Sequence, residues 1–333
     1  MSAKKMNQMN GRRFLGYSAL GLAGLTILPG RAMAHRVKVS PDIKRRIKTT
    51  FMLLSIACLI TSCASRHSSK FGNVQVGTIT YSYREMPDQT LTATLDYIVR
   101  SGINSVELMG NTVEEYAGLP REGQREWRAS VSMDKFREIK KMFDAKGIRI
   151  HILKLETFGS DEEIDYAFKV CNTLGAMGIT TEVSLDAAKR LAPFAEKHKS
   201  HIIFHNHCQS GEPGFSYDPI LAVSKSVMLN FDCGHYFGVT GQNPCEMIKK
   251  YHDRIASLHL KDKTGPTAQS SCGDNRIWGQ GQTPLIEILQ LIHKEKYPVF
   301  CDIELEYGVP DGSDPVTEIA KCVDFCRRAL KRR

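Results

Sequence analysis

The 333-residue sequence predicts a (β/α)8 barrel that occupies residues 71–333 as one domain. Strand-like apolar runs alternate with helix-like segments along this region. The helix-like segments repeat apolar residues every three to four positions, which is the spacing of an amphipathic helix. A doubly wound open sheet is the alternative, and a sheet of that kind is expected to have a glycine-rich turn after its first strand. The segment Gly77-Thr-Ile-Thr-Tyr81 lacks that pattern, so the barrel is favoured.

The expected strands are short and rich in aliphatic and β-branched residues. They span residues 74–81, 103–108, 148–153, 179–183, 201–205, 228–232, 255–260 and 298–303. Helices are expected over residues 88–101, 133–146, 161–174, 186–198, 284–294 and 315–330. Asp, Ser or Pro stands near most helix starts, and Gly102, Gly147 and Gly175 follow three helix ends. Residues 109–132 are long and polar for a connection, and we expect them to form a loop that covers a site.

Residues 1–70 are expected to be an export leader followed by a polar tether. The first leader segment contains Arg12-Arg13, an apolar run and an A-x-A cleavage site at 32–34, and it resembles a twin-arginine leader. The second contains basic residues at 44–48, an apolar run at 51–62 and then Cys63. Its last four residues, Ile60-Thr-Ser-Cys63, resemble a bacterial lipobox, in which Cys63 is lipidated. We expect an exported protein, periplasmic or anchored to the membrane as a lipoprotein, and leave open which segment is used.

The formal charge of +9 comes from the leader. Residues 1–70 hold thirteen of the 45 basic residues and one of the 36 acidic residues. Residues 71–333 therefore hold 32 basic and 35 acidic residues, a net charge of −3. A mildly acidic body argues against a nucleic-acid partner.

The 10 cysteines do not suggest a disulfide framework. Two lie in the leader and the others are scattered, so we expect buried free thiols. A pair such as Cys245 with Cys272 is the alternative in an exported protein.

Four polar residues stand at the ends of four successive expected strands, and they are His205, Asp232, His259 and Glu304. The carboxyl ends of all strands in a (β/α)8 barrel lie on one face, so these side chains are expected to meet there. Two imidazoles and two carboxylates suit one divalent cation, such as Mn²⁺, Zn²⁺, Co²⁺ or Mg²⁺. Glu182, at the end of the preceding strand, is the alternative to His205 as the fourth ligand.

Glu182, His207 and His235 are the candidates for proton transfer. His207 shares a strand face with His205 because side chains alternate along a strand. Gly234 permits a tight turn that returns His235 toward the mouth of the barrel.

Three side chains are candidates for substrate binding. Lys261 faces the same way as His259 and is expected to hold a sugar hydroxyl or an enediolate oxygen. Lys154 stands at the end of the third strand. Trp278 begins a Gly-flanked loop, expected to be a flexible lid whose aromatic face stacks on a sugar ring. For Glu107, a salt bridge and a functional role are equally expected, and the choice is left open.

These motifs together resemble the sugar phosphate isomerase/epimerase superfamily, the xylose isomerase-like barrels (AP endonuclease 2 family) that also include endonuclease IV. The resemblance covers residues 72–331 and rests on GTITYSYRE, FHNHC, FDCGH, SLHLKD, IWGQGQ and DIELEYG. It implies a xylose isomerase-like TIM barrel whose metal ligands are the four strand-end residues named above. His205 stands where the sugar epimerases usually have Glu, and the HNH sequence resembles an exported branch with members that act on 3-keto sugars and glycosides.

The expected function is that of a metal-dependent sugar isomerase or epimerase, which removes a proton next to a carbonyl group and passes through an enediolate. One alternative is a metal-dependent lyase, hydratase or hydrolase of 3-keto sugars or glycosides. Another is a lipid-anchored sugar-binding module without catalysis. An endonuclease IV-like phosphodiesterase is disfavoured by the acidic body. The expected partner is a small sugar or keto sugar, with membrane contact only through the lipid anchor, and the oligomeric state is left open.

Overall fold

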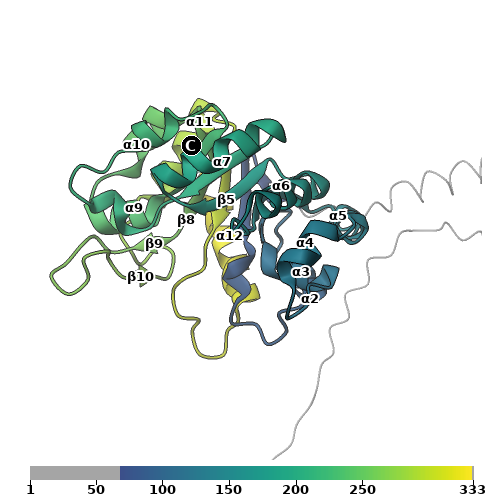
Figure 1. Cartoon of the computed structure of the whole chain (residues 1–333). Coiled ribbons are helices and arrows are strands. Elements are labelled where there is room, and N and C mark those ends of the chain that lie inside the picture. Colours follow the sequence, from purple (N-terminus) through teal and green to yellow (C-terminus); the bar gives the residue numbers. More distant parts are fainter. Residues whose placement is uncertain (1–67, 332–333) are drawn as a thin grey trace, which may run out of the picture. The chain divides into compact units, whose positions relative to one another are not determined.

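The computed structural model describes residues 68–331, and Figure 1 shows a central set of strands with helices packed around it. Both predicted leader segments, including Cys63, lie outside the described residues. Among the helices of residues 68–331, none combines the length and the apolar character that crossing a membrane requires.

The parallel strands close into a barrel, because β2 pairs with β11 on one side and with β3 on the other. In order around the barrel they are β2 (Val74–Ile79), β3 (Ser105–Met109), β4 (Arg149–Lys154), β5 (Gly178–Glu182), β6 (His201–His205), β7 (Val227–Asp232), β8 (Ile255–Leu260) and β11 (Phe300–Ile303). The expected (β/α)8 barrel is therefore confirmed. Chain order and spatial order coincide, so the carboxyl ends of all these strands open onto one face.

Three two-residue strands lie outside the parallel barrel. β1 (Lys70–Phe71) adds to β2 in the antiparallel direction. β9 (Asp262–Lys263) and β10 (Asn275–Arg276) pair as a small ribbon beyond the end of β8. This ribbon lies below α9 in Figure 1.

The helices expected from the sequence all form. They are α2 (Leu91–Arg100), α5 (Asp134–Ala145), α6 (Asp161–Leu174), α7 (Leu185–Lys197), α11 (Leu285–Glu295) and α12 (Pro315–Lys331). Ser160 and Ser184 cap α6 and α7 by accepting a hydrogen bond from the backbone of the first turn. Gly175 ends α6 at φ 74°, a left-handed conformation that glycine adopts without strain.

Residues 109–132 are not the loop that the sequence suggested. They contain α3 (Gly110–Ala117) and α4 (Gln124–Ser130). Trp127 of α4 packs edge-on against Tyr166 of α6, and Arg128 forms ion pairs with Glu114 and Glu163. The expectation of a loop was wrong because a polar, mostly exposed segment can still form a helix when a few side chains, here Trp127 and Arg128, attach it to neighbouring helices.

Five more short helical segments shape the region around the strand ends. They are η1 (Thr80–Tyr83), η2 (Cys208–Gly211), α8 (Asp218–Leu221), α9 (Cys233–Thr240) and α10 (Pro244–Tyr251). Asp232 caps α9, because its Oδ1 accepts a hydrogen bond from the backbone nitrogen of His235 at 2.7 Å. Segments this short hold too few turns for a periodic apolar pattern, so the sequence did not reveal them.

A buried polar pair lies inside the barrel below the mouth. His151 Nε2 is 2.7 Å from Asp302 Oδ2, and its Nδ1 is 2.9 Å from the hydroxyl of Ser105. Gly77 makes room for this pair, since a Cβ there would collide with the side chain of Asp302. Asp302, the one acidic residue of β11, thus contacts the interior of the barrel.

One disulfide joins Cys208 to Cys272, with Cα atoms 5.9 Å apart. The other six cysteines within residues 68–331 are free and buried, as expected. The expectation was wrong for this one pair, and the suggested partner Cys245 is free in α10. Spacing along the chain did not indicate the pair, because loops after β6 and β8 bring the two residues together.

Candidate active site

Four polar side chains converge at the carboxyl end of the barrel. They are His205, Asp232, His259 and Glu304, the residues predicted to bind a metal ion. One potential ligand atom of each lies within 4.8 Å of the others, and all four residues are buried. His205 and Asp232 end their strands, His259 is the penultimate residue of β8, and Glu304 directly follows β11. Glu182, the alternative fourth ligand, is outside this group.

The cluster fits a bound cation. Among the described residues, the buried Nδ1 of His205 has no hydrogen-bond partner. Buried polar atoms are nearly always paired in native proteins, so an unpaired ring nitrogen beside two carboxylates and a second imidazole is consistent with a site for a cation. Imidazole and carboxylate groups together suit Zn²⁺, Mn²⁺ or Co²⁺, with Mg²⁺ favouring the carboxylates.

His259 lies between two carboxylates. Its Nδ1 is 2.7 Å from Glu304 Oε2, and its Nε2 is 2.7 Å from Glu107 Oε2. Burial alone lowers the pKa of His259, but the two carboxylates outweigh it and raise that pKa well above its ordinary value. Glu107 therefore forms an ion pair with a candidate metal ligand, and a functional role for it stays a prediction. Thr180 and Asn230 donate hydrogen bonds to the same carboxylate.

Lys261 supplies a positive charge beside the cluster. Its ammonium is 2.8 Å from Glu304 and Glu306 and 2.9 Å from Asp232, and the residue is 2% exposed. Burial disfavours the charge, but these carboxylates raise the pKa of Lys261 above its usual range. In this arrangement the ammonium contacts protein carboxylates, and a contact with substrate stays a prediction.

Gly234 allows Lys261 to occupy this place. A Cβ on Gly234 would collide with the Lys261 stem and would lie 2.7 Å from the Lys261 carbonyl oxygen. Gly234 lies inside α9 and has ordinary helical backbone angles. The glycine is thus required for close packing, and the expectation of a tight turn at this position was wrong.

Glu182 and His207 form a half-exposed pair at the mouth. The Nδ1 of His207 donates a hydrogen bond of 2.8 Å to Glu182 Oε2. This hydrogen bond raises the pKa of His207. Burial raises the pKa of Glu182, but the hydrogen bond from His207 and the nearby His205 and Lys154 together outweigh burial and bring the pKa to about 2. Lys154 donates to the other carboxylate oxygen at 3.2 Å.

His235 faces the cluster from α9. Its Nε2 is 3.9 Å from Asp232 Oδ2 and 3.7 Å from Glu306 Oε2. Burial and the charge of Lys261 lower the pKa of His235 to about 2. The low pKa keeps the ring neutral. The side chain lies at the mouth of the barrel, as the sequence predicted, beside the candidate metal cluster.

A cavity of about 180 Å³ opens onto this site. Its lining consists of Ile79, Tyr81, Met109, Lys154, His205, His207, His259, Glu304 and Glu306. Ligand pockets for drug-sized molecules usually measure about 300–1,000 Å³. This cavity is smaller, and its size suits a single sugar or cyclitol ring.

Trp278 does not line this cavity. Its ring packs edge-on against Phe325 of α12, with centroids 5.5 Å apart, and it lines a separate hollow over that helix. The loop that follows is anchored, because Asp262 accepts hydrogen bonds from the backbone of Gly279 and Gly281. The expectation of a flexible lid over the site does not match this placement.

Tyr81 provides the aromatic side chain that the sequence analysis assigned to Trp278. It stands just after β2, is 41% exposed and lines the cavity. Glu306, an acid near the end of the last strand that the sequence did not single out for a role, also lines the cavity. The signal for both was their position just beyond a barrel strand, where side chains reach the mouth.

A closed (β/α)8 barrel with a candidate cation-binding cluster at its strand ends defines the class of this protein. The family model described as "Xylose isomerase-like TIM barrel" matches residues 178–329, which hold β5 to β11 and most of the site. The fold is that of a xylose isomerase-like TIM barrel.

Solved structures cover nearly the whole barrel at low identity. A sugar phosphate isomerase/epimerase from Parabacteroides distasonis is 19% identical with a TM-score of 0.58, and the match covers 79% of this chain and 97% of that one. The IolI protein with a bound zinc atom is 16% identical with a TM-score of 0.53, over 78% and 99% of the chains. The probable 3-DHS dehydratase AsbF from Bacillus anthracis is 14% identical with a TM-score of 0.53, over 77% and 97%. At these identities the likeness shows the fold.

Sequence relatives match a shorter stretch. An inosose dehydratase of Clostridium botulinum is 36% identical over 76 residues, which is 22% of this chain and 25% of that protein. An inosose dehydratase of Bacillus thuringiensis is 30% identical over 80 residues, which is 23% of this chain and 26% of that protein. The chain thus spans about a quarter of the length of these relatives.

Proposed function

We propose that the protein is a metal-dependent enzyme that removes a proton next to the carbonyl group of a small keto sugar or keto cyclitol. The observation that carries this proposal is the position of the Glu182–His207 pair. His207 lines the same small cavity as three residues of the cation-binding cluster, namely His205, His259 and Glu304. A proton carrier beside a cation site is the combination that enolisation requires.

A divalent metal held by His205, Asp232, His259 and Glu304 would stabilise the negative charge that develops on the substrate oxygens. The protein's own residues carry the proton. Glu182 accepts the Nδ1 hydrogen of His207, which leaves Nε2 as the ring nitrogen that takes the proton from carbon. Lys154 lines the cavity and donates to Glu182, so its ammonium is also within reach of a substrate oxygen.

The enediolate of the substrate has two fates. Return of the proton to another position gives isomerisation or epimerisation, which is the outcome we expect. Loss of a hydroxyl group from the neighbouring carbon gives a dehydratase. The second candidate is supported by the sequence relatives, which are inosose dehydratases, and by the small cavity, which suits a single ring.

The experiment is solvent exchange in deuterated water. Metal-replete protein is incubated with a panel of keto sugars, 3-keto glycosides and inosose, and the carbon next to each carbonyl is examined by NMR. We expect deuterium at that carbon for at least one compound. His207→Ala and Glu182→Gln should slow the exchange by roughly 10²–10⁴-fold, the usual contribution of a positioned base.

Glu156→Gln is the matched control, because Glu156 stands near the end of the neighbouring strand and does not line the cavity. It should exchange at the wild-type rate. Product mass separates the two fates, because only dehydration removes water. If several compounds bind tightly and none exchanges or is converted, the protein is a sugar-binding module and the enolisation proposal is wrong.

A further inference from the structure

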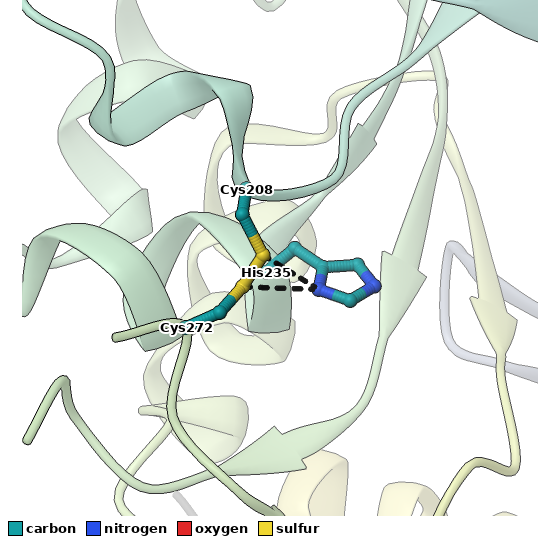
Figure 2. Close-up of side chains that lie close together, drawn as sticks. All are labelled: Cys208, His235 and Cys272. Atoms are coloured by element: carbon teal, nitrogen blue, oxygen red, sulfur yellow. Dashed lines mark hydrogen bonds between the residues drawn. A yellow bond between two sulfur atoms is a disulfide. The ribbon is translucent and has the colours of Figure 1, made fainter. Parts of the chain in front are cut away.

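A second cluster of metal-ligating atoms lies beside the candidate active site. It consists of Cys208, His235 and Cys272, and one potential ligand atom of each lies within 4.8 Å of the others. The Nδ1 of His235 is 4.0 Å from Cys208 Sγ and 3.9 Å from Cys272 Sγ. Figure 2 shows this nitrogen facing both sulfur atoms, while the other ring nitrogen points away from them. The cluster shares no residue with the four candidate ligands of the active site.

Reduction of the disulfide would turn these three residues into a common ligand set. The thiolate, and not the disulfide, is the metal-binding form of cysteine. Two thiolates and one imidazole suit Zn²⁺ in a tetrahedral site whose fourth position holds water. With Zn–S bonds of about 2.3 Å and a Zn–N bond of about 2.0 Å, a tetrahedron places nitrogen roughly 3.6 Å from each sulfur and the sulfurs about 3.8 Å apart. The nitrogen–sulfur distances are already close to this value, so mainly the two sulfurs have to separate.

The far side of the His235 ring has the surroundings of a metal-binding histidine. Such a histidine usually directs its second ring nitrogen at a carboxylate, which orients the ring. The Nε2 of His235 is 3.9 Å from Asp232 Oδ2 and 3.7 Å from Glu306 Oε2. The ring therefore faces two sulfurs with one nitrogen and two carboxylates with the other.

The segments that carry the two cysteines pack on α9 independently of the bridge. Cys208 begins η2, and a Cβ on Gly211 at the end of η2 would collide with Val239 of α9. Cys272 lies in the loop between β9 and β10, and a Cβ on Gly238 of α9 would collide with the carbonyl oxygen of Cys272. The pairing of β9 with β10 fixes the two ends of this loop. We therefore expect both thiols to stay beside His235 after the S–S bond is broken.

The two sulfur atoms are also within reach of solvent. Cys208 and Cys272 are half-buried, whereas the six free cysteines of the described chain are buried. Thiol–disulfide exchange requires access to the sulfur that is attacked, so this pair is the one expected to react with a reductant and then with a metal ion.

We propose that Cys208, His235 and Cys272 bind a zinc ion when the disulfide is reduced. A dithiol supplies two electrons and two protons, which break the S–S bond and give two thiols, and the dithiol becomes a disulfide. Zn²⁺ then displaces the two thiol protons and forms two S–Zn bonds and one N–Zn bond. Exchange with a disulfide oxidant re-forms the bridge and releases the ion. The site thus holds either the bridge or the metal, according to the redox state of the compartment.

Cobalt absorption tests this proposal, because thiolate bound to Co²⁺ gives a charge-transfer absorption in the near ultraviolet. The four candidate ligands of the active site include no sulfur, so an ion bound there does not contribute. The purified protein is reduced with tris(2-carboxyethyl)phosphine, which takes the oxygen of one water molecule and becomes the phosphine oxide. After anaerobic removal of the phosphine, the protein is titrated with Co²⁺ beside the oxidised protein. We expect the absorption in the reduced protein alone, saturating at about one sulfur-bound ion per chain and abolished by Zn²⁺.

Metal content supplies the second readout. The reduced protein should hold about one more zinc ion per chain than the oxidised protein, measured by inductively coupled plasma mass spectrometry. The double variant Cys208→Ser/Cys272→Ser should lack both the cobalt absorption and the additional ion. Cys245→Ser, which removes a buried free thiol of α10, should keep both. Glu304→Gln, which removes a candidate ligand of the other cluster, should also keep both.

Two results would overturn the proposal. One is equal zinc content of the oxidised and reduced wild type, a comparison that needs no variant to fold. The other is a cobalt–thiolate absorption that persists in the double variant, because other cysteines would then hold the ion. This inference does not rest on the proposed function. A gain of one ion on reduction, with no ion in the oxidised protein, would support the second site and contradict the candidate active-site cluster.

Discussion

Lys261 is the residue whose role changes most between sequence and structure. The sequence suggested a substrate contact, whereas the structure places its ammonium among three carboxylates, two of which belong to the candidate metal cluster. A cation in that position offsets the negative charge of Asp232 and Glu304 when no metal is bound. The same charge repels an incoming divalent ion, so Lys261 is expected to weaken metal binding.

We therefore expect Lys261→Met to bind Zn²⁺ or Mn²⁺ more tightly than the wild type. Two unit charges about 4 Å apart interact by roughly 4 kcal/mol at an effective dielectric constant of about 20, so a gain of at least tenfold, about 1.4 kcal/mol, is a cautious estimate. Isothermal titration of the chelator-stripped protein measures it. The metal-free variant should also melt at a lower temperature, because buried carboxylates lose their partner.

Lys154→Met is the matched control for this experiment. Lys154 pairs with Glu182, which is not part of the cluster, so its removal should leave the metal affinity within about threefold of the wild type. Equal affinities of the Lys261 variant and the wild type would contradict the assigned role and favour a direct contact between Lys261 and substrate.

Residue types at strand ends were enough to predict the four-residue cluster, but not which aromatic side chain lines the cavity. The four candidate ligands each stand within one residue of the carboxyl end of an apolar strand, so their convergence follows from barrel geometry alone. Trp278 lies in a long connection whose course depends on tertiary hydrogen bonds to Asp262, and no local pattern reveals those. Tyr81 was predictable in principle, because it stands just beyond the first barrel strand.

At the level of elements, the long amphipathic segments were predictable and the short ones were not. α6 matches its expected range residue for residue, because it combines a serine cap, a 3.6-residue apolar pattern and a final glycine. α9 has eight residues and is apolar on most sides, so it carries no such pattern. Yet α9 holds His235 and Gly234, and its position beside Lys261 completes the site.

The disulfide is the second element-level feature that sequence patterns did not reveal. Cys208 and Cys272 are separated by 64 residues, and other cysteines lie between them. Only the closed barrel, which places the loops after β6 and β8 near each other, selects this pair. Disulfides persist in oxidising compartments, so the bridge supports the proposal of an exported protein.

At the level of the whole molecule, the sequence predicts an export leader in front of the barrel. The export proposal rests on the lipobox-like segment Ile60-Thr-Ser-Cys63, which lies outside the described residues. We expect the mature protein to begin at Cys63 and to partition with membranes through the attached lipid. Cys63→Ala should abolish labelling with a radioactive fatty acid and release the protein from the membrane fraction. A mature protein that retains residues 1–62 in the cytosol would contradict this.

The barrel as a whole brings residues that are distant in sequence to one place. His205, Asp232, His259 and Glu304 are spread over a hundred residues of sequence, and their convergence depends on every strand between β6 and β11. The central claim is that this convergence creates one cation site, from which the proposed chemistry follows.

Metal stoichiometry tests that claim most directly. The purified protein, dialysed after exposure to Zn²⁺ or Mn²⁺, is measured by inductively coupled plasma mass spectrometry beside Asp232→Asn, Glu304→Gln and the surface control Glu138→Gln. We predict about one ion per chain in the wild type and in Glu138→Gln, and less than about a tenth of that in the other two variants. A full complement of metal in both Asp232→Asn and Glu304→Gln would show that the site is not where the structure places it.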